Sequence, residues 1–172
     1  MHLYHIALQR LVGKELVPLN KLRYESFALY NQAIAKYQGR GELMRVVIPP
    51  LNCLWNDVVF LTAVHPSDFG RVFEQAGSSL RKGAFYQIDA RTLDRNRLAM
   101  LLYEGKDEET RVFRSFSFSD FPKYARIPDG TVEYYRAELA AGRRPLIFHK
   151  IPHILYKGSI NVAEAPIVEI DQ

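Results

Sequence analysis

The order of hydrophobic and polar positions divides the chain into short apolar runs and longer amphipathic stretches. Short apolar or alternating runs that are bounded by glycine, proline or charged residues are typical of strands. We expect strands at 2–8, 53–64, 84–90, 112–118, 145–149, 153–157 and 166–170. Residues 98–104, LAMLLYE, fit either a strand or a helix.

Apolar residues at helical spacing predict helices between these runs. We expect helices at 20–38, at 67–77 and from Asp129 or Thr131 to 141, with a further turn at 41–47. Asn20 and Ser67 are suitable N-caps for the first two helices, because their side-chain oxygens accept backbone N–H groups. This mixed order of elements predicts one α+β domain over residues 1–172, with largely antiparallel sheets.

Composition and charge narrow the functional classes only moderately. Of the 172 residues, 48% are hydrophobic and 24% are charged, as in ordinary globular proteins. The sequence contains no apolar run of the ~18 residues that span a bilayer, the start lacks the features of a signal peptide, and there is one cysteine. We therefore expect a cytoplasmic protein without a membrane partner. The net charge of +4 permits a nucleic-acid partner without requiring one.

Metal chemistry has little support in the sequence. The spacings typical of zinc and calcium sites do not occur. His149 and His153 are four residues apart on a predicted strand, which places them about 13 Å apart along it. One metal ion cannot bridge that distance, and we expect no metal site.

Several conspicuous side chains have ordinary structural interpretations. A histidine within a strand, such as His5, is most often a structural residue. Trp55 favours a turn with a packed indole over a substrate clamp. Phe113, Phe116 and Phe118 favour the core over a base-stacking platform.

A family resemblance gives these residues a second interpretation. The first strand contains Tyr-His (LYHIA), and the segment AIAKYQGRGELMRVVIPPLNCLWNDVVFLTAVHPSD leads through a helix, an arginine and a Pro-Pro loop into a strand with Phe-Leu-Thr. Together with FYQIDARTLD and ILYKGSINVAEAPIVEI, this order resembles the NAD-dependent ADP-ribosyltransferase superfamily, and within it the bacterial toxins that ADP-ribosylate DNA. The resemblance implies split antiparallel sheets with flanking helices.

The same resemblance implies an NAD site. His5 would bond a ribose hydroxyl, with Tyr4 and Ile6 beside it at the nicotinamide amide. Arg40, or less favourably Arg45, would face the pyrophosphate or the target base, a task that suits a permanently charged, forked guanidinium.

Two further residues complete the implied cofactor site. Thr62 would lie beside the nicotinamide, at the end of its strand. Tyr86 is a candidate to stack nearby, although no family motif covers it.

The expected catalytic carboxylate is not evident. In the superfamily a glutamate opens the strand that corresponds to 153–157, where it stabilises the positive charge that develops on the ribose. This chain has Pro152 and His153 there. Three explanations stay open. In the first, a different register matches Glu138 to the carboxylate. In the second, His153, His149, Arg40 and His5 act without a glutamate, as in RNA 2′-phosphotransferases. In the third, catalysis has been lost.

The sequence thus predicts NAD-dependent transfer of ADP-ribose to a nucleic-acid base or a protein, in a toxin or conflict setting with an antitoxin or regulatory partner. The alternative is an inactive domain of the same fold that binds a nucleotide or nucleic acid. The third possibility is an unrelated α+β interaction module.

Overall fold

The computed structural model describes residues 1–8, 11–80, 83–103 and 110–170. The strands are β1 (His2–Ile6), β2 (Glu15–Leu16), β3 (Val47–Ile48), β4 (Cys53–Leu54), β5 (Val58–Leu61), β6 (Ala84–Asp89), β7 (Leu98–Tyr103), β8 (Arg111–Ser115), β9 (His153–Lys157), β10 (Ile160–Asn161) and β11 (Ile167–Glu169). The α-helices are α1 (Leu19–Glu25), α2 (Phe27–Ile34), α3 (Pro66–Gln75), α4 (Phe121–Tyr124) and α5 (Thr131–Ala140). Single 3₁₀ turns are η1 (Ala35–Tyr37), η2 (Gly41–Arg45), η3 (Pro49–Leu51), η4 (Trp55–Asp57), η5 (Ala90–Thr92), η6 (Arg95–Arg97) and η7 (Phe118–Asp120).

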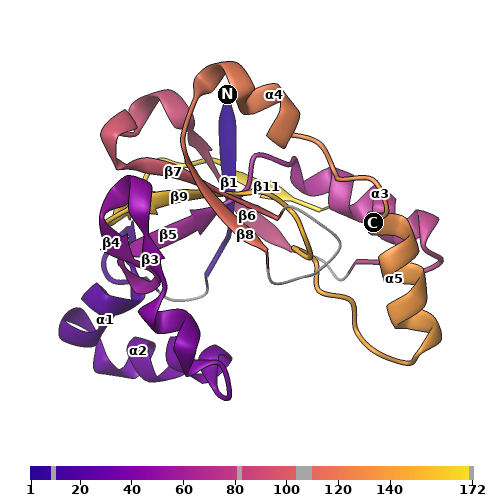
Figure 1. Ribbon diagram of the computed structural model, residues 1–172, viewed down its shortest axis with the longest axis horizontal. Helices are drawn as coiled ribbons and strands as arrows, with labels where there is room; N and C mark the ends of the chain where they lie inside the picture. Colours follow the sequence, from indigo (N-terminus) through magenta and orange to yellow (C-terminus); the bar gives the residue numbers. More distant parts are fainter. Residues whose placement is uncertain (9–10, 81–82, 104–109, 171–172) are drawn as a thin grey trace.

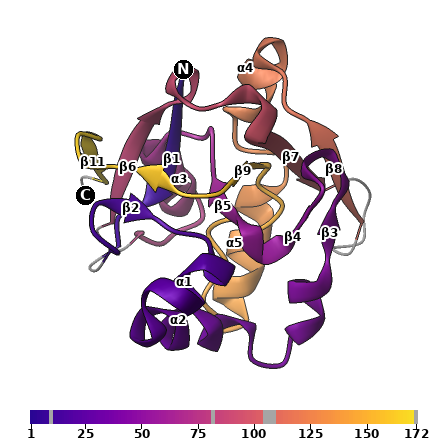
Figure 2. The same cartoon turned by 90° about the vertical axis from the view of Figure 1, so that its left-hand side faces the viewer.

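Two antiparallel sheets form the centre of the molecule (Figures 1 and 2). One has the strand order β1-β6-β11 and the other β5-β9-β7-β8. They meet where Tyr4 of β1 pairs with Thr62, directly after β5, through backbone hydrogen bonds of 2.8 and 3.0 Å. Two short pairs, β2–β10 and β3–β4, extend this framework. The α+β prediction with antiparallel sheets is confirmed.

Apolar side chains from both sheets fill the space where the sheets meet. Leu3 of β1 lies in one buried cluster with Leu61, Met100 and Ile154 of the other sheet. A second cluster packs α3 and α5 against the β1 sheet, with the rings of Phe73 and Tyr135 4.3 Å apart. In Figure 1 these two helices lie at one side of the molecule, whereas α1 and α2 lie at the other.

The first predicted helix is divided into two. It begins at Leu19 after Pro18, so Asn20 lies inside the helix and is not its N-cap. Ser26 adopts an extended conformation that ends α1, and its hydroxyl then accepts the N–H of Leu29 at the start of α2. A serine that bonds the local backbone favours such a boundary over a continuous helix. The predicted turn at 41–47 is present as η2.

Two strand predictions are wrong in part or whole. The run 53–64 is interrupted, because the Asp57 carboxylate accepts the Leu54 N–H at 2.8 Å and closes the turn η4 before β5 begins. Segment 145–149 forms no strand: residues 147–149 belong to a turn, and Ile147 and Phe148 pack against the second core cluster. Residues 98–103 are a strand, which settles the ambiguous segment.

The remaining elements agree with the pattern to within a few residues. Helix α5 ends before Gly142, which has a φ of 70°. Phe116 is buried in the core, with Phe118 packed against it at 5.0 Å. Within the described ranges, no helix combines the length and apolar character needed to cross a membrane.

Candidate functional site

A cleft of about 340 Å³ lies among segments that are far apart in sequence. Its lining combines cationic and aromatic side chains with a few aliphatic ones, namely Arg40, Leu43, Trp55, Tyr103, Arg111, Leu146, Ile147, Phe148, His149 and Lys150. We call it the Arg40 cleft. The connection between η1 and η2, the turn η4, the ends of β7 and β8, and segment 146–150 each contribute to it.

Lys36 interacts electrostatically with both Arg40 and His5. The Arg40 Nη2 donates a hydrogen bond of 2.7 Å to the carbonyl of Lys36, which is one helical turn earlier. Burial and the positive charge of Arg40 lower the pKa of Lys36. The pKa of His5 is also lowered, first by burial and further by the charge of Lys36. His5 is not among the residues that line the Arg40 cleft, so the structure does not bring it into one cleft with Arg40.

Aromatic side chains form the wall beside Arg40. The Trp55 Nε1 donates to the Tyr37 hydroxyl at 3.2 Å, and both residues are buried. The guanidinium of Arg111 lies over the Trp55 ring, 5.7 Å from its centroid. The Phe60 ring also packs against the indole, with the ring centroids 4.7 Å apart. These contacts hold the Arg111 guanidinium at the cleft, where a cation suits a phosphate.

His153 lies behind this wall at the start of β9. Its ring makes edge contacts with Phe60, Tyr103 and Phe148 at 5.9 to 6.3 Å. Burial lowers the pKa of His153 to about 4, against the opposing effect of a hydrogen bond to the backbone of Leu61. The imidazole is therefore neutral at pH 7, and His153 adds no charge to the cleft.

The other predicted cofactor residues lie near the junction of the two sheets. The side chain of Thr62 is buried, and its hydroxyl accepts the Val64 N–H at 3.1 Å. Tyr4 is buried against the His65 ring, whereas Ile6 is exposed. Tyr86 pairs with His5 across β1 and β6 and packs against the core. None of these residues lines the Arg40 cleft.

Glu138 lies on α5 and outside the lining of the Arg40 cleft. Its carboxylate accepts two hydrogen bonds from Arg143, at 2.6 and 2.9 Å. These bonds and the charge of Arg143 lower the pKa of Glu138. Glu138 therefore forms an ion pair at the end of a helix, and the structure does not bring it together with Arg40.

Carboxylates and metal-ligand clusters are not part of this site as far as the structure describes the chain. The described lining of the Arg40 cleft includes neither aspartate nor glutamate. Across the described ranges, no three His, Cys, Asp or Glu side chains converge as a metal site would require. The acidic run 104–109 lies outside the described residues.

The structure adds residues that the motif comparison missed. Arg111, Tyr103, Phe148 and Lys150 line the cleft, although none belongs to a recognised motif. Basic and aromatic residues alternate in RVFRSF, which was the sequence signal available for Arg111. Nothing in the local sequence of Lys150 indicates the cleft, because its position there depends on contacts between segment 146–150 and distant parts of the chain.

Comparisons of this chain with protein-family models, with curated proteins and with solved structures gave no match.

Proposed function

We propose that this chain is an ADP-ribosyltransferase-like domain that binds NAD in the Arg40 cleft. The observation that carries the proposal is the convergence of Arg40, Arg111 and the Trp55 ring on one cleft. Guanidinium groups hold a pyrophosphate, and the buried Trp55 ring holds the Arg111 guanidinium beside the cleft. The chain has two antiparallel sheets, and the Tyr4–Thr62 backbone pair joins them next to His5. This arrangement supports the resemblance of the sequence to the ADP-ribosyltransferase superfamily.

Transfer of ADP-ribose to a nucleic-acid base or a protein is the activity that we propose for this site. Cleavage of the bond between nicotinamide and ribose builds positive charge on the sugar, which a nearby carboxylate stabilises in the transition state. The described lining of the Arg40 cleft has no carboxylate. Transfer therefore requires that a carboxylate enters the cleft when the substrates bind.

The second candidate is a domain of the same architecture that binds a nucleotide without transferring it. The observation that favours it is the neutral, ring-packed His153 at the position where the superfamily has glutamate. Glu138 offers no ready substitute, because Arg143 already holds its carboxylate.

Thermal unfolding with and without NAD tests the binding proposal. Saturation to 100 times the Kd stabilises a folded protein by about 2.7 kcal/mol. We expect NAD to raise the Tm of the wild-type chain, and Arg40→Ala to remove most of that increase. Arg40 is exposed, so its removal should leave the fold intact. Arg23→Ala, an exposed arginine on α1, is the matched control and should respond to NAD like the wild type.

Nicotinamide release separates the two candidates. Release that requires Arg40 and His5, in the presence of nucleic acid or protein acceptors, supports transfer. Stabilisation by NAD without release supports the binding domain. A Tm that does not respond to NAD would contradict NAD binding and, with it, the transfer proposal.

A further inference from the structure

An apolar groove of about 470 Å³ lies between the helix pair α1–α2 and the segment 11–17, which carries β2 (Figure 2). Leu22 of α1, Leu29 and Ala33 of α2, and Leu11 and Val17 of segment 11–17 form its walls. We call it the α2 groove. Its lining and that of the Arg40 cleft have no residue in common, so the two are separate candidate sites.

The periodicity of helix and strand directs the lining side chains toward the groove. Leu29, Gln32 and Ala33 are three and four residues apart, so they share one face of α2. Across the groove, Leu16 points into the core, where it is fully buried. Its neighbours Glu15 and Val17 therefore point to the opposite face, and both line the groove.

The helix α2 has an apolar sequence, FALYNQAI, but none of its residues is fully buried. Leu29 and Ala33, on the face that lines the groove, are partly buried. Apolar surface that stays in contact with water costs free energy, which an apolar ligand in the groove would recover. The groove also has the size and the mostly apolar lining of a small-molecule site, with a few polar groups beside it.

The charge at the groove is negative. The Lys21 Nζ lies 3.1 Å from the Glu25 carboxylate and 3.8 Å from the Glu15 carboxylate, so one ammonium is shared between two carboxylates. These three groups together carry one unbalanced negative charge. Glu15 is the charged side chain of the described lining, and it is the more distant partner of Lys21. A cationic ligand group therefore complements Glu15.

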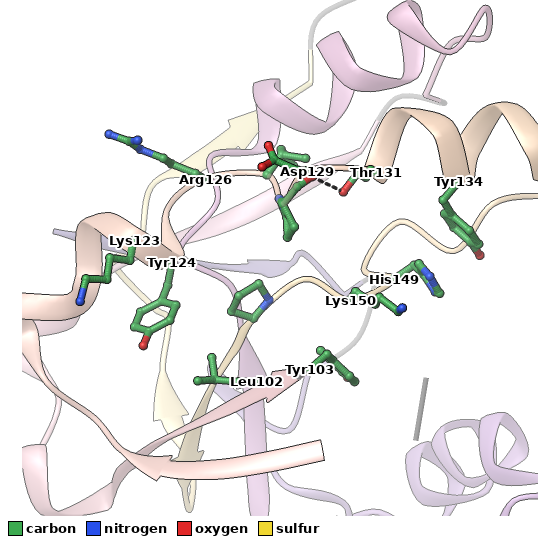
Figure 3. A pocket seen from close by; sticks show the side chains of 14 residues that line it. Leu102, Tyr103, Lys123, Tyr124, Arg126, Asp129, Thr131, Tyr134, His149 and Lys150 are labelled. Atoms are coloured by element: carbon green, nitrogen blue, oxygen red, sulfur yellow. Dashed lines mark hydrogen bonds between the residues drawn. The ribbon is translucent and has the colours of Figure 1, made fainter. Parts of the chain in front are cut away.

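A larger cavity, of about 790 Å³, lies between α4 and the first turn of α5. Its cationic side chains Arg126 and Lys150 are at opposite ends and point apart (Figure 3). One ligand group cannot contact both, so the charges do not define a ligand for that cavity. In the α2 groove, by contrast, one carboxylate lies at an aliphatic wall, which defines both ends of a ligand.

We propose that the α2 groove binds a small aliphatic molecule that carries an ammonium group. The aliphatic part contacts Leu22, Leu29 and Ala33, and the ammonium faces the Glu15 carboxylate. Burial of the aliphatic part supplies most of the affinity, because it does not depend on direction. The carboxylate accepts charge-assisted hydrogen bonds and fixes the orientation. This site is independent of NAD binding in the Arg40 cleft, so either proposal can fail without the other.

Calorimetry with octylamine, propylamine and octan-1-ol at pH 7 tests the proposal in the full chain. Octylamine should bind at least tenfold more tightly than propylamine, which keeps the ammonium but has a much shorter chain. It should bind about threefold more tightly than octan-1-ol, because an ion pair with the 42% exposed Glu15 side chain is weak. Backbone amide NMR shifts should locate octylamine at 11–17 and 29–33.

Two variants test the two parts of the site. Ala33→Phe places a ring in the groove and should weaken octylamine binding at least tenfold, whereas Ala137→Phe, at an exposed position of α5, should not. Glu15→Gln should bind octylamine and octan-1-ol equally, whereas Glu74→Gln, at an exposed position of α3, should keep the preference for the amine. Circular dichroism checks that each variant is folded.

Four results would overturn the proposal. They are equal affinities for octylamine and propylamine, wild-type affinity in a folded Ala33→Phe, an amine preference that persists in Glu15→Gln, and shifts confined to the Arg40 cleft. Sedimentation tests another occupant of the groove. A wild-type chain that sediments as a dimer, with Ala33→Phe as a monomer, would assign the groove to a second copy of the chain and would also overturn the proposal.

Discussion

His153 illustrates how the environment of one residue changes its chemistry. In the sequence it occupies the position of an expected glutamate and is a candidate cation for holding phosphate. In the structure three aromatic rings surround it, and burial favours the neutral imidazole. A neutral ring neither stabilises a developing positive charge as a carboxylate does nor attracts a phosphate as a cation does. The charge in the neighbouring cleft comes from Arg40, Arg111 and Lys150 instead.

The lowered pKa of His153 predicts acid sensitivity of the fold. The folded pKa is about 4 and the usual value is 6.5, so only the unfolded state takes up this proton as the pH falls from 6.5 toward 4. The free energy of unfolding should therefore be highest above pH 6.5 and decrease toward pH 4, by at most about 1.4 kcal/mol per pH unit for this one group. His5, whose pKa is also lowered, adds to the decrease in the same direction.

Urea unfolding at pH 7 and pH 5 measures this effect. His153→Asn should lose less stability than the wild type between the two pH values. His2→Asn, at an exposed position of β1, is the control and should keep the wild-type difference. An unchanged pH dependence in His153→Asn would show that His153 is not the group responsible.

At the scale of elements, short polar and glycine-containing turns decide where the strands begin and end. Asp57 ends the turn η4 before β5, and its carbonyl accepts the N–H of Gly158, which follows β9, at 3.1 Å. Gly158 has a φ of 99°, and the Arg97 guanidinium occupies the space that a Cβ would take. The turn between β9 and β10 thus requires a residue without a side chain.

Gly158→Ala should destabilise the protein by about 1–2 kcal/mol, because an alanine is strained at this φ even if Arg97 moves away. Chemical denaturation at pH 7 measures the change. Gly41→Ala is the matched control, since it has an ordinary φ and only one atom, 4.0 Å away, near the new methyl group. We expect the control to lie within about 0.5 kcal/mol of the wild type. Equal stability of the two variants would contradict the steric argument.

At the scale of the whole molecule, the two sheets share one core. Leu3 belongs to the β1 sheet, is fully buried, and packs in a cluster with Leu61 and Ile154 of the other sheet. The Tyr4–Thr62 backbone pair adds a direct connection. Loss of either sheet would expose the apolar surface of the other, and we therefore expect them to unfold together.

Leu3→Ala tests this coupling. Truncation of a fully buried leucine costs about 2–5 kcal/mol. Trp55, the single tryptophan, reports on the region beside β5, and far-UV circular dichroism reports on the whole chain. Both transitions should shift to lower denaturant by the same amount. Leu146→Ala, at a side chain that is 65% exposed, should shift neither. A tryptophan transition that stays in place in Leu3→Ala would indicate independent sheets.

The sequence by itself determined the α+β class and most of the elements, because strand alternation and helix-ending glycines are local signals. β1, β6 and α5 lie close to their predicted bounds. The interruption of run 53–64 also has a local cause, the hydrogen bond from the Leu54 N–H to the Asp57 carboxylate. The prediction of one continuous strand followed the apolar residues of the run and gave Asp57 too little weight.

Only the tertiary structure decided what the remaining residues do. Segment 145–149 has an apolar pattern but forms no strand, because a strand requires a pairing partner that the local sequence does not specify. His5 and Arg40 were identified from motifs, whereas Trp55, Arg111 and Lys150 join the cleft through contacts between distant segments. The charge of His153 was likewise set by its burial among rings, which depends on how distant segments pack around β9. Contacts between distant residues arise from the packing of the whole chain, so the local pattern of this sequence does not predict them.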